Sequence, residues 1–327
     1  MTSIFKLRNL MASAAALVAL PLAAQAQTGP GFSGAMTLGY SSSNIDIGPG
    51  DADVTGMSLD IETDVAFSSA FSVGLDFGVS TSSIDLGVGD LEFDLIGLAI
   101  EPVYQFGNGA YAGVYYRMGD FDLSIPPLLG SATFGIDTQS YGVFGGYEHG
   151  PLWVEAFVGT SDTDLGLFGE IDILDYGIAA SYQINGQLGV FGSVLRTDIE
   201  AFTIDVDLTS AAIGADYDFG NGFMAYGSVG FLNVNEPFGA DISGNNLTLG
   251  GSYDLSGMGT PVILSAEYSR TTIDIGAAPP FIDPEVDRFA VGLTIPLGGG
   301  SSTPLNSNTR TARGDYRSVI AALANSI

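Results

Sequence analysis

Five carboxylates are the residues of this chain whose type and spacing could support chemistry. Each lies about five to seven residues from a predicted tight turn, so strands that meet at those turns would bring all of them to one level: Glu62, Asp76, Glu101, Glu155 and Glu267. Carboxylates that face one another can act as acid and base in hydrolysis, and a ring of them can concentrate cations in a passage. Two arginines and one aspartate are predicted to lie higher on the same surface: Arg117, Asp175 and Arg288.

The other reactive residue types do not indicate a catalytic site. The chain has one histidine, His149, which stands beside Gly150-Pro151 in a predicted turn, and it has no cysteine. A nucleophile therefore lacks a nearby base, and a zinc site lacks ligands. The glycine-rich stretches are followed by no helix that would hold a phosphate. We expect no enzymatic activity, no metal and no cofactor.

The carboxylates have two interpretations that the sequence leaves open. They line a water-filled passage, or they are the polar inward residues that hydrate any closed sheet. A turn centred on Ser69 places Glu62 directly opposite Asp76, and facing carboxylates repel unless one is protonated or a cation lies between them. On that basis Glu62→Gln should cost no stability. Two arginines are expected to neutralise part of the remaining charge, Arg117 beside Glu101 and Arg288 beside Glu267.

Strand-like runs between Gly31 and Leu297 must position these residues. Large apolar residues alternate with small or polar ones, which is typical of strands with two unlike faces; in the first run Phe32, Met36, Leu38 and Tyr40 alternate with Ser33, Ala35, Thr37 and Gly39. The runs are ~10 to 13 residues long, as tilted membrane-crossing strands are. No segment reaches the roughly 18 uninterrupted apolar residues that a membrane helix needs.

The connections between runs alternate between short and long. Asn-Gly and Gly-Asn-Gly sequences supply the positive φ of tight hairpins, and the short turns are Ser68-Ser69-Ala70, Gly107-Asn108-Gly109, Glu148 to Pro151, Asn185-Gly186, Gly220-Asn221-Gly222 and Ser256 to Thr260. The longer loops lie near 44–54, 80–91, 119–132, 160–171, 197–202, 233–242 and 272–285. These connections join about 14 strands, an even number whose two ends lie on the short-turn side.

Three of the long loops repeat a Ser/Thr-rich motif that ends in an acidic residue between two apolar ones. The motifs are Ser43-Asn44-Ile45-Asp46-Ile47-Gly48, Ser82-Ser83-Ile84-Asp85-Leu86-Gly87 and Thr271-Thr272-Ile273-Asp274-Ile275-Gly276. They are either divalent-cation sites that bridge lipopolysaccharide or strands that continue above the membrane. The second interpretation is favoured, because calcium loops need denser oxygen ligands.

The amino end and the overall charge restrict where the protein works and what it binds. Lys6 and Arg8 precede an apolar run that ends in Ala24-Gln25-Ala26, which predicts a signal peptide over residues 1–26. The formal net charge is −28. A polyanion repels nucleic acid, so we expect no nucleic-acid partner.

The strand spacing, the turns and the aromatic residues near both predicted rims resemble those of the Gram-negative outer-membrane porins. The resemblance implies an all-β fold, a transmembrane antiparallel up-and-down β-barrel with short periplasmic turns and longer extracellular loops over residues 27–298. It also implies a place in the cell outer membrane, with lipid and lipopolysaccharide around the barrel. The last run, Phe289 to Leu297, resembles the signal that the barrel-assembly machinery reads in this family.

From this resemblance we expect a channel for passive diffusion of small hydrophilic solutes and cations. The acidic excess among the residues expected to line its pore predicts cation preference. These residues are Glu62, Asp76, Glu101, Arg117, Glu155, Asp175, Glu267 and Arg288. The alternative is a structural or adhesive outer-membrane barrel without an open pore. The oligomeric state stays open, with a slight preference for a monomer because no loop is long enough to fold into the barrel.

Residues 299–327 form an extension that porins of this kind do not usually have. Tyr316, Val319, Ile320, Leu323 and Ile327 fit one face of a helix. Arg310, Arg313 and Arg317 make the extension basic beside an acidic barrel. It is expected in the periplasm, where it either faces peptidoglycan or partly occludes the barrel mouth by charge attraction.

Overall fold

The computed structural model describes residues 31–46, 50–85, 90–125, 132–164, 170–201, 204–235, 242–259, 261–276, 284–298, 304–319 and 321. The predicted signal peptide and parts of most long loops lie outside these residues. The leader and the amino end of the predicted barrel domain, residues 27–30, are therefore expectations from sequence alone.

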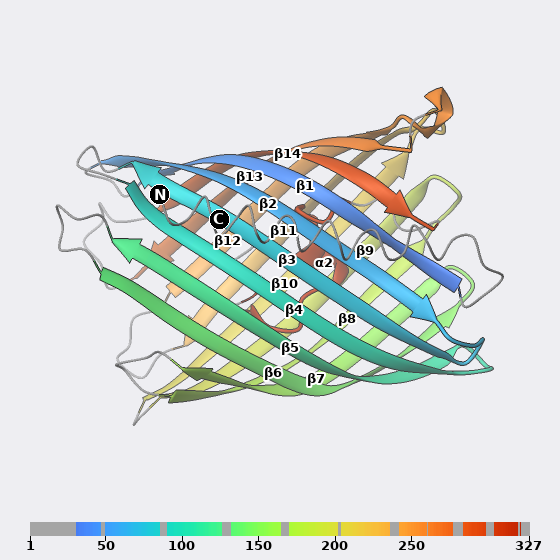
Figure 1. Ribbon diagram of the computed structural model, residues 1–327, viewed down its shortest axis with the longest axis horizontal. Coiled ribbons are helices and arrows are strands. Elements are labelled where there is room, and N and C mark those ends of the chain that lie inside the picture. The colour runs from blue at the N-terminus through green and yellow to red at the C-terminus, as the bar shows by residue number, and fades with distance from the viewer. Residues whose placement is uncertain are drawn as a thin grey trace.

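The chain forms a closed barrel of antiparallel strands in which each strand pairs with its neighbours in sequence and β1 pairs with β14 (Figure 1). The 14 strands are β1 (Gly31–Asp46), β2 (Asp51–Ala66), β3 (Phe71–Asp85), β4 (Asp90–Phe106), β5 (Ala110–Ile125), β6 (Ala132–His149), β7 (Leu152–Asp164), β8 (Glu170–Gln183), β9 (Leu188–Ala201), β10 (Ile204–Asp218), β11 (Phe223–Asn235), β12 (Ile242–Asp254), β13 (Ile263–Ile275) and β14 (Glu285–Leu297). The predicted fold class and strand number are confirmed.

Alternation places the apolar side chains outside the barrel. On β1, Leu38 and Tyr40 are each 45% exposed, whereas the neighbouring Thr37, which points to the opposite face of the strand, is fully buried. An exposed apolar band is stable only against lipid. Among the described residues, no helix is long and apolar enough to cross a membrane.

The predicted hairpins set the register that the site depends on. The turn after β2 pairs Glu62 with Asp76, and the rings of Phe67 and Phe71 lie 5.9 Å apart at its base. Glycine at positive φ closes other turns, as at Gly109 with φ 90°. Glu62 and Asp76 therefore face each other as the sequence predicted.

The long loops are shorter than predicted, because the strands continue into them. β1 runs to Asp46 and β2 begins at Asp51, and Asn44 donates a hydrogen bond of 3.0 Å to Asp53 across this extension. The described parts of the three repeated motifs lie mainly in β1, β3 and β13. Polar cross-strand pairs keep the ladder intact beyond the apolar band, which agrees with the interpretation as strand continuation.

The extension beyond β14 does not lie where the sequence placed it. β14 ends at Leu297, and the described chain resumes at Pro304 inside the barrel, where it includes the short helix α2 (Thr309–Arg313) (Figure 1). We call Pro304–Val319 the C-terminal segment. α2 lies upstream of the helix predicted from Tyr316 onward; Val319 and Ala321 in that region are helical, and Ile320, Leu323 and Ile327 lie outside the described residues. The segment is internal because its polar side chains find partners on the wall.

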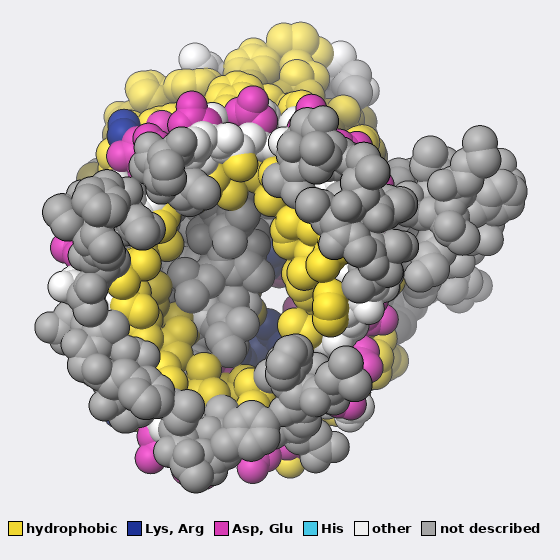
Figure 2. All heavy atoms as spheres, turned by 90° about the vertical axis from the view of Figure 1, so that its left-hand side faces the viewer, with side chains coloured by type: hydrophobic (Ala, Val, Ile, Leu, Met, Phe, Trp, Pro, Cys, Tyr) yellow, Lys and Arg dark blue, Asp and Glu magenta, His cyan; other side chains and the backbone are white. Residues whose placement is uncertain are grey.

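Figure 2 looks into the end of the barrel where the longer loops lie. The interior is hollow at this end, hydrophobic side chains cover the near part of the wall, and acidic side chains are distributed around the rim. Basic side chains are visible deeper inside.

Candidate functional site

The interior carboxylates and the C-terminal segment form one network. Every one of the five carboxylates that the sequence placed at one level faces the interior, and four of them bond directly to the segment: Glu62, Glu101, Glu155 and Glu267. The fifth, Asp76, lies opposite Glu62. The four bonded carboxylates therefore meet a part of the chain that the prediction left outside the barrel.

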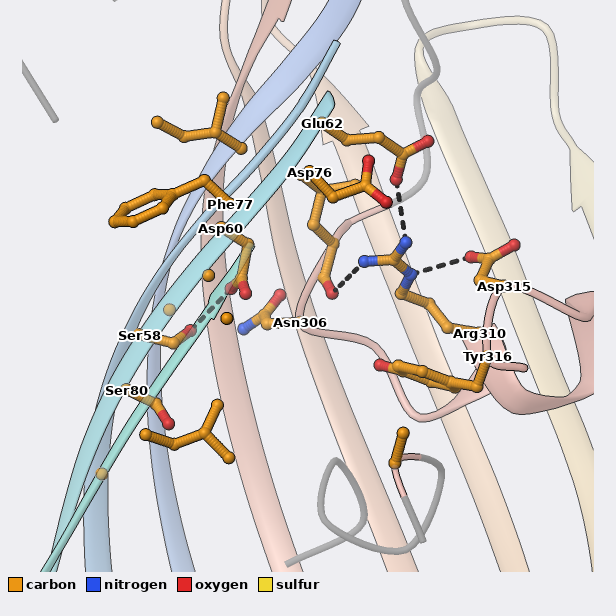
Figure 3. Close-up of a pocket in the computed structure, with 18 of the residues that line it drawn as sticks. Ser58, Asp60, Glu62, Asp76, Phe77, Ser80, Asn306, Arg310, Asp315 and Tyr316 are labelled. Carbon is orange, nitrogen blue, oxygen red and sulfur yellow. Dashed lines mark hydrogen bonds and ion pairs between the residues drawn. The ribbon is translucent and has the colours of Figure 1, made fainter. Parts of the chain in front are cut away.

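Arg310 joins the segment to β2. Its Nη2 donates to Glu62 Oε2 at 2.8 Å, its Nε donates to Asp315 Oδ2 at 2.8 Å and its Nη1 donates to the Leu305 carbonyl at 3.1 Å (Figure 3). Burial by itself lowers the pKa of Arg310, but the carboxylates of Asp315 and Glu62 outweigh it and raise the pKa well above its usual value. The guanidinium therefore stays charged.

Arg317 joins the segment to β4 and β7. It donates to Glu101 and, at 2.9 Å, to Glu155 Oε1. The guanidinium carbon lies 4.1 Å from the ring centre of Phe144 and 5.2 Å from that of Tyr115. The side chain is 8% exposed, so it is a buried cation held by two carboxylates and two aromatic faces.

Arg313 and the first residues of the segment hold it to the remaining wall. Arg313 Nη2 lies 3.0 Å from Asp216 on β10 and its guanidinium carbon lies 4.0 Å from the Phe191 ring centre. The Asn308 backbone N–H donates to Glu267 Oε1 at 2.9 Å, and the Ser307 hydroxyl donates to the same carboxylate. The segment thus contacts the wall in several directions.

Arg117, Asp175 and Arg288, which were predicted to lie higher on the wall, bond to other wall residues and lie near the C-terminal segment. Arg117 Nη2 donates to Glu101 at 2.9 Å and lies 3.8 Å from Asp76, and Arg288 Nη1 lies 3.6 Å from Glu267. Both predicted arginine–carboxylate pairs are confirmed. Asp175 accepts hydrogen bonds from Thr197 and from Ser161, the latter at 3.3 Å.

The facing pair Glu62 and Asp76 is compensated from within the chain. Sequence reasoning expected a shared proton or an external cation, whereas the structure places Arg310 on Glu62 and Arg117 near Asp76. We therefore reverse the expectation for the neutral variant. Glu62→Gln should lower the free energy of unfolding by up to about 1 kcal/mol, because the Glu62 side chain is 47% exposed and water screens the pair.

The control for this measurement is Asp76→Asn, which removes the same charge but no bond to the segment. It should leave the urea unfolding midpoint unchanged or raise it slightly, because it relieves repulsion from Glu62. A Glu62→Gln protein as stable as the parent would show that the Arg310 pair contributes nothing to folding.

Small inward residues make room for the segment. A Cβ added at Gly39 would lie 3.3 Å from the Asn306 Cβ, and one added at Gly292 would lie 2.9 Å from the Asn306 Oδ1. Gly314 has φ +82°, and a Cβ there would lie 2.1 Å from the Ala179 Cβ. The space beside these small inward residues is thus occupied by the chain itself.

Two cavities remain beside the segment, on the side of the barrel wall that is formed mainly by β1–β5. One has a volume of about 340 Å³ and includes Asp60, Ser80 and Arg288 in its lining, and the other has about 430 Å³ and includes Asp64, Tyr111 and Glu155. Both are lined by the same five charged residues: Glu62, Asp76, Arg117, Arg310 and Asp315. Both cavities therefore border this charged cluster.

Five site residues were not predicted as such from the sequence: Asp60, Asp216, Arg310, Arg313 and Arg317. Asp60 has the same strand parity as Glu62, and the basic spacing of 310, 313 and 317 was visible, so a signal existed for both. In the described part of the chain, no group of three acidic or histidine side chains is arranged to hold a metal ion.

The family model for Gram-negative porins matches residues 99–275, more than half of the chain. The chain belongs to the Gram-negative porin family. No curated protein matches it.

Solved structures similar to this porin-family chain have the same kind of barrel. An anion-selective porin from Comamonas acidovorans superposes with a TM-score of 0.50 at 12% identity, over 82% of this chain and 99% of that one. A Pseudomonas aeruginosa FadL homologue gives 0.52 at 12% identity, over 81% and 90%. An OmpT loop-deletion mutant, from an outer-membrane protein of Vibrio cholerae, gives 0.51 at 10%, over 82% and 99%. At these identities the likeness concerns the fold.

Proposed function

We propose that the protein is an outer-membrane channel for passive diffusion of small hydrophilic solutes, with a preference for cations. The observation that carries the proposal is the acidic excess of the interior. Among the described residues that contact the C-terminal segment or line the two cavities, ten carboxylates face five guanidinium groups. The carboxylates are Asp60, Asp64, Glu62, Asp76, Glu101, Glu155, Asp175, Asp216, Glu267 and Asp315, and the guanidinium groups are Arg117, Arg288, Arg310, Arg313 and Arg317.

The charge excess supports cation preference because the interior has low-dielectric walls. A passage with unbalanced fixed charge concentrates ions of opposite sign and repels the others. The segment arginines neutralise part of the ring that the sequence predicted, yet Asp60 and Asp76 line the cavities without a direct bond to the segment. Both carboxylates are therefore placed where permeating ions could meet them.

Family membership supports the outer membrane as the location, with the short turns toward the periplasm. Lipid and lipopolysaccharide would surround the apolar band, and the barrel-assembly machinery would insert the chain. The alternative function, a structural or adhesive barrel without an open pore, is favoured by the amount of chain inside the lumen. Conductance separates the two.

The test is the reversal potential of the purified protein in a planar bilayer under a KCl gradient. The parent should prefer K⁺, and the preference should fall in the Asp60→Asn, Asp76→Asn double variant. Selectivity should weaken as salt rises, because the Debye length shrinks to ~3 Å at 1 M. The control is Asp172→Asn, since Asp172 is exposed near the start of β8. Anion preference in the parent would overturn the proposed selectivity.

A further inference from the structure

We infer that the C-terminal segment is a constriction built into the pore, that solutes pass between it and β1–β5, and that Arg310 is the residue that sets the width and charge of this route. The inference rests on the proposed channel function and adds to it the position of the route and its selectivity-determining residue.

The segment is held in place by its own bonds to separate parts of the wall. The Leu305 backbone N–H donates to Thr37 Oγ1 on β1 at 3.2 Å. On the far side, the Ser193 hydroxyl of β9 donates to the Thr311 carbonyl at 2.6 Å. Together with the arginine pairs to β2, β4, β7 and β10, these bonds span the lumen.

The fit between segment and wall is steric as well as electrostatic. Ala312 and Val319 are fully buried, Asn306 lies close to the inward glycines Gly39 and Gly292, and Gly314 lies against Ala179. The Val319 N–H also donates to Thr197 Oγ1 at 3.1 Å. A loosely placed tail would not match the wall at so many points.

The remaining space is unevenly distributed around the segment. The two cavities beside β1–β5 share five lining residues, whereas two other cavities, of about 290 and 230 Å³, share none with each other. One of the latter is lined by Ala312 and Val319, and the other by Arg313 and Asp216. A continuous route through the described residues is therefore best supported beside β1–β5.

Arg310 occupies the place where the two connected cavities meet. It lines both of them and bridges Glu62 of the wall to Asp315 of the segment (Figure 3). A guanidinium there narrows the route and opposes the surrounding carboxylates. Its loss should widen the passage and leave Glu62 and Asp76 facing the permeating ions.

Arg313 provides a matched control three positions away in the same helix. It makes a carboxylate pair of similar length, 3.0 Å to Asp216 compared with 2.8 Å for Arg310 and Glu62. It lines neither of the two connected cavities. A route beside β1–β5 predicts unequal effects for the two arginines, whereas general loosening of the segment predicts equal ones.

The position of the segment can be fixed independently with a disulfide. The chain has no cysteine, and the Cβ positions of residues 39 and 306 lie 3.3 Å apart, close to the ~3.5–4.5 Å of a disulfide. Gly39→Cys with Asn306→Cys should therefore cross-link on oxidation of the folded barrel, as detected by mass spectrometry of the peptides.

The deciding experiment compares single-channel conductance and reversal potential for full-length variants in planar bilayers. Arg310→Gln should raise conductance at least about twofold and strengthen cation preference, and Arg313→Gln should change both much less. In the oxidised cysteine-pair background, Arg310→Gln should keep its effect, because the segment stays anchored. The triple variant with Gln at 310, 313 and 317 should conduct more than any single variant.

The outcomes separate this inference from the proposed function. If the parent conducts but Arg310→Gln and Arg313→Gln change conductance equally, or neither changes it, the proposed route is wrong. The proposed channel function is not contradicted by that result. Failure of the cysteine pair to cross-link in the folded protein overturns the docked position. A parent and triple variant that both fail to conduct overturn the channel itself.

Discussion

Arg317→Gln is expected to lower the free energy of unfolding by about 3 kcal/mol, at the lower end of the range for breaking a buried ion pair. The variant leaves Glu101 and Glu155 inside the barrel without the cation that joins them. The loss is limited because Arg117 still bonds Glu101 and the Tyr111 hydroxyl still donates to Glu155 at 3.0 Å. Urea unfolding in detergent micelles, followed by circular dichroism, measures the shift.

A double-mutant cycle with Glu155→Gln isolates the pair. The double variant should recover part of the loss, because no buried carboxylate is then left without its guanidinium partner. Arg196→Gln is the control, since Arg196 bonds Asp198 and Asp207 but is 42% exposed, so its loss should be under about 1 kcal/mol. Equal losses for Arg317→Gln and Arg196→Gln would contradict a buried role for Arg317.

Gly314→Ala should be the most disruptive single-methyl addition in the C-terminal segment. The backbone has φ +82°, which costs an L-residue about 1–2 kcal/mol, and the new Cβ would lie 2.1 Å from the Ala179 Cβ, an overlap of the kind that costs about 1–3 kcal/mol. The expected result is release of the segment. Its measure is a lower yield of the disulfide between cysteines at 39 and 306 in the Gly314→Ala background.

Two further variants separate the strain from the overlap. Gly220→Ala carries similar strain, with φ +75°, but a Cβ there meets no atom within 4 Å, so it should leave the disulfide yield unchanged. Ala179→Gly combined with Gly314→Ala removes the overlap and should restore most of the yield. A yield that Ala179→Gly does not restore would place residue 314 elsewhere in the lumen.

The barrel could be predicted in detail because its signals are local. Period-two alternation and turn sequences fix which residues face inward and which residues pair across a hairpin, and from these the pairs Glu62 with Asp76 and Arg117 with Glu101 follow directly. The loop limits were less accurate, since polar strand extensions such as Asn44 with Asp53 lack the apolar alternation that marks a strand.

The docking of the C-terminal segment could not be predicted because it depends on contacts between residues far apart in the sequence. Arg310 meets Glu62, which precedes it by 248 residues, and Arg317 meets Glu155, which precedes it by 162. Charge attraction pointed to an association of a basic tail with an acidic barrel, but charge alone does not distinguish the mouth from the interior. The position of the segment depends on steric fit. Which glycine and alanine residues lie against Asn306 and Gly314 is known only once the barrel has folded.

The junction of β1 and β14 gives the first residues of the segment a second consequence. These two strands are the neighbouring pair that no connecting loop joins, so their contact depends on the hydrogen-bond ladder from Gly34 and Leu297 upward and on the bond of 2.8 Å between the Thr37 and Thr294 hydroxyls. Leu305 bonds Thr37 on one strand, and Asn306 bonds the Val291 carbonyl of the other at 3.2 Å. The first residues of the C-terminal segment thereby cross-link β1 and β14 from inside the lumen. This stabilises barrel closure at the pair of strands whose separation would open the barrel laterally to the lipid.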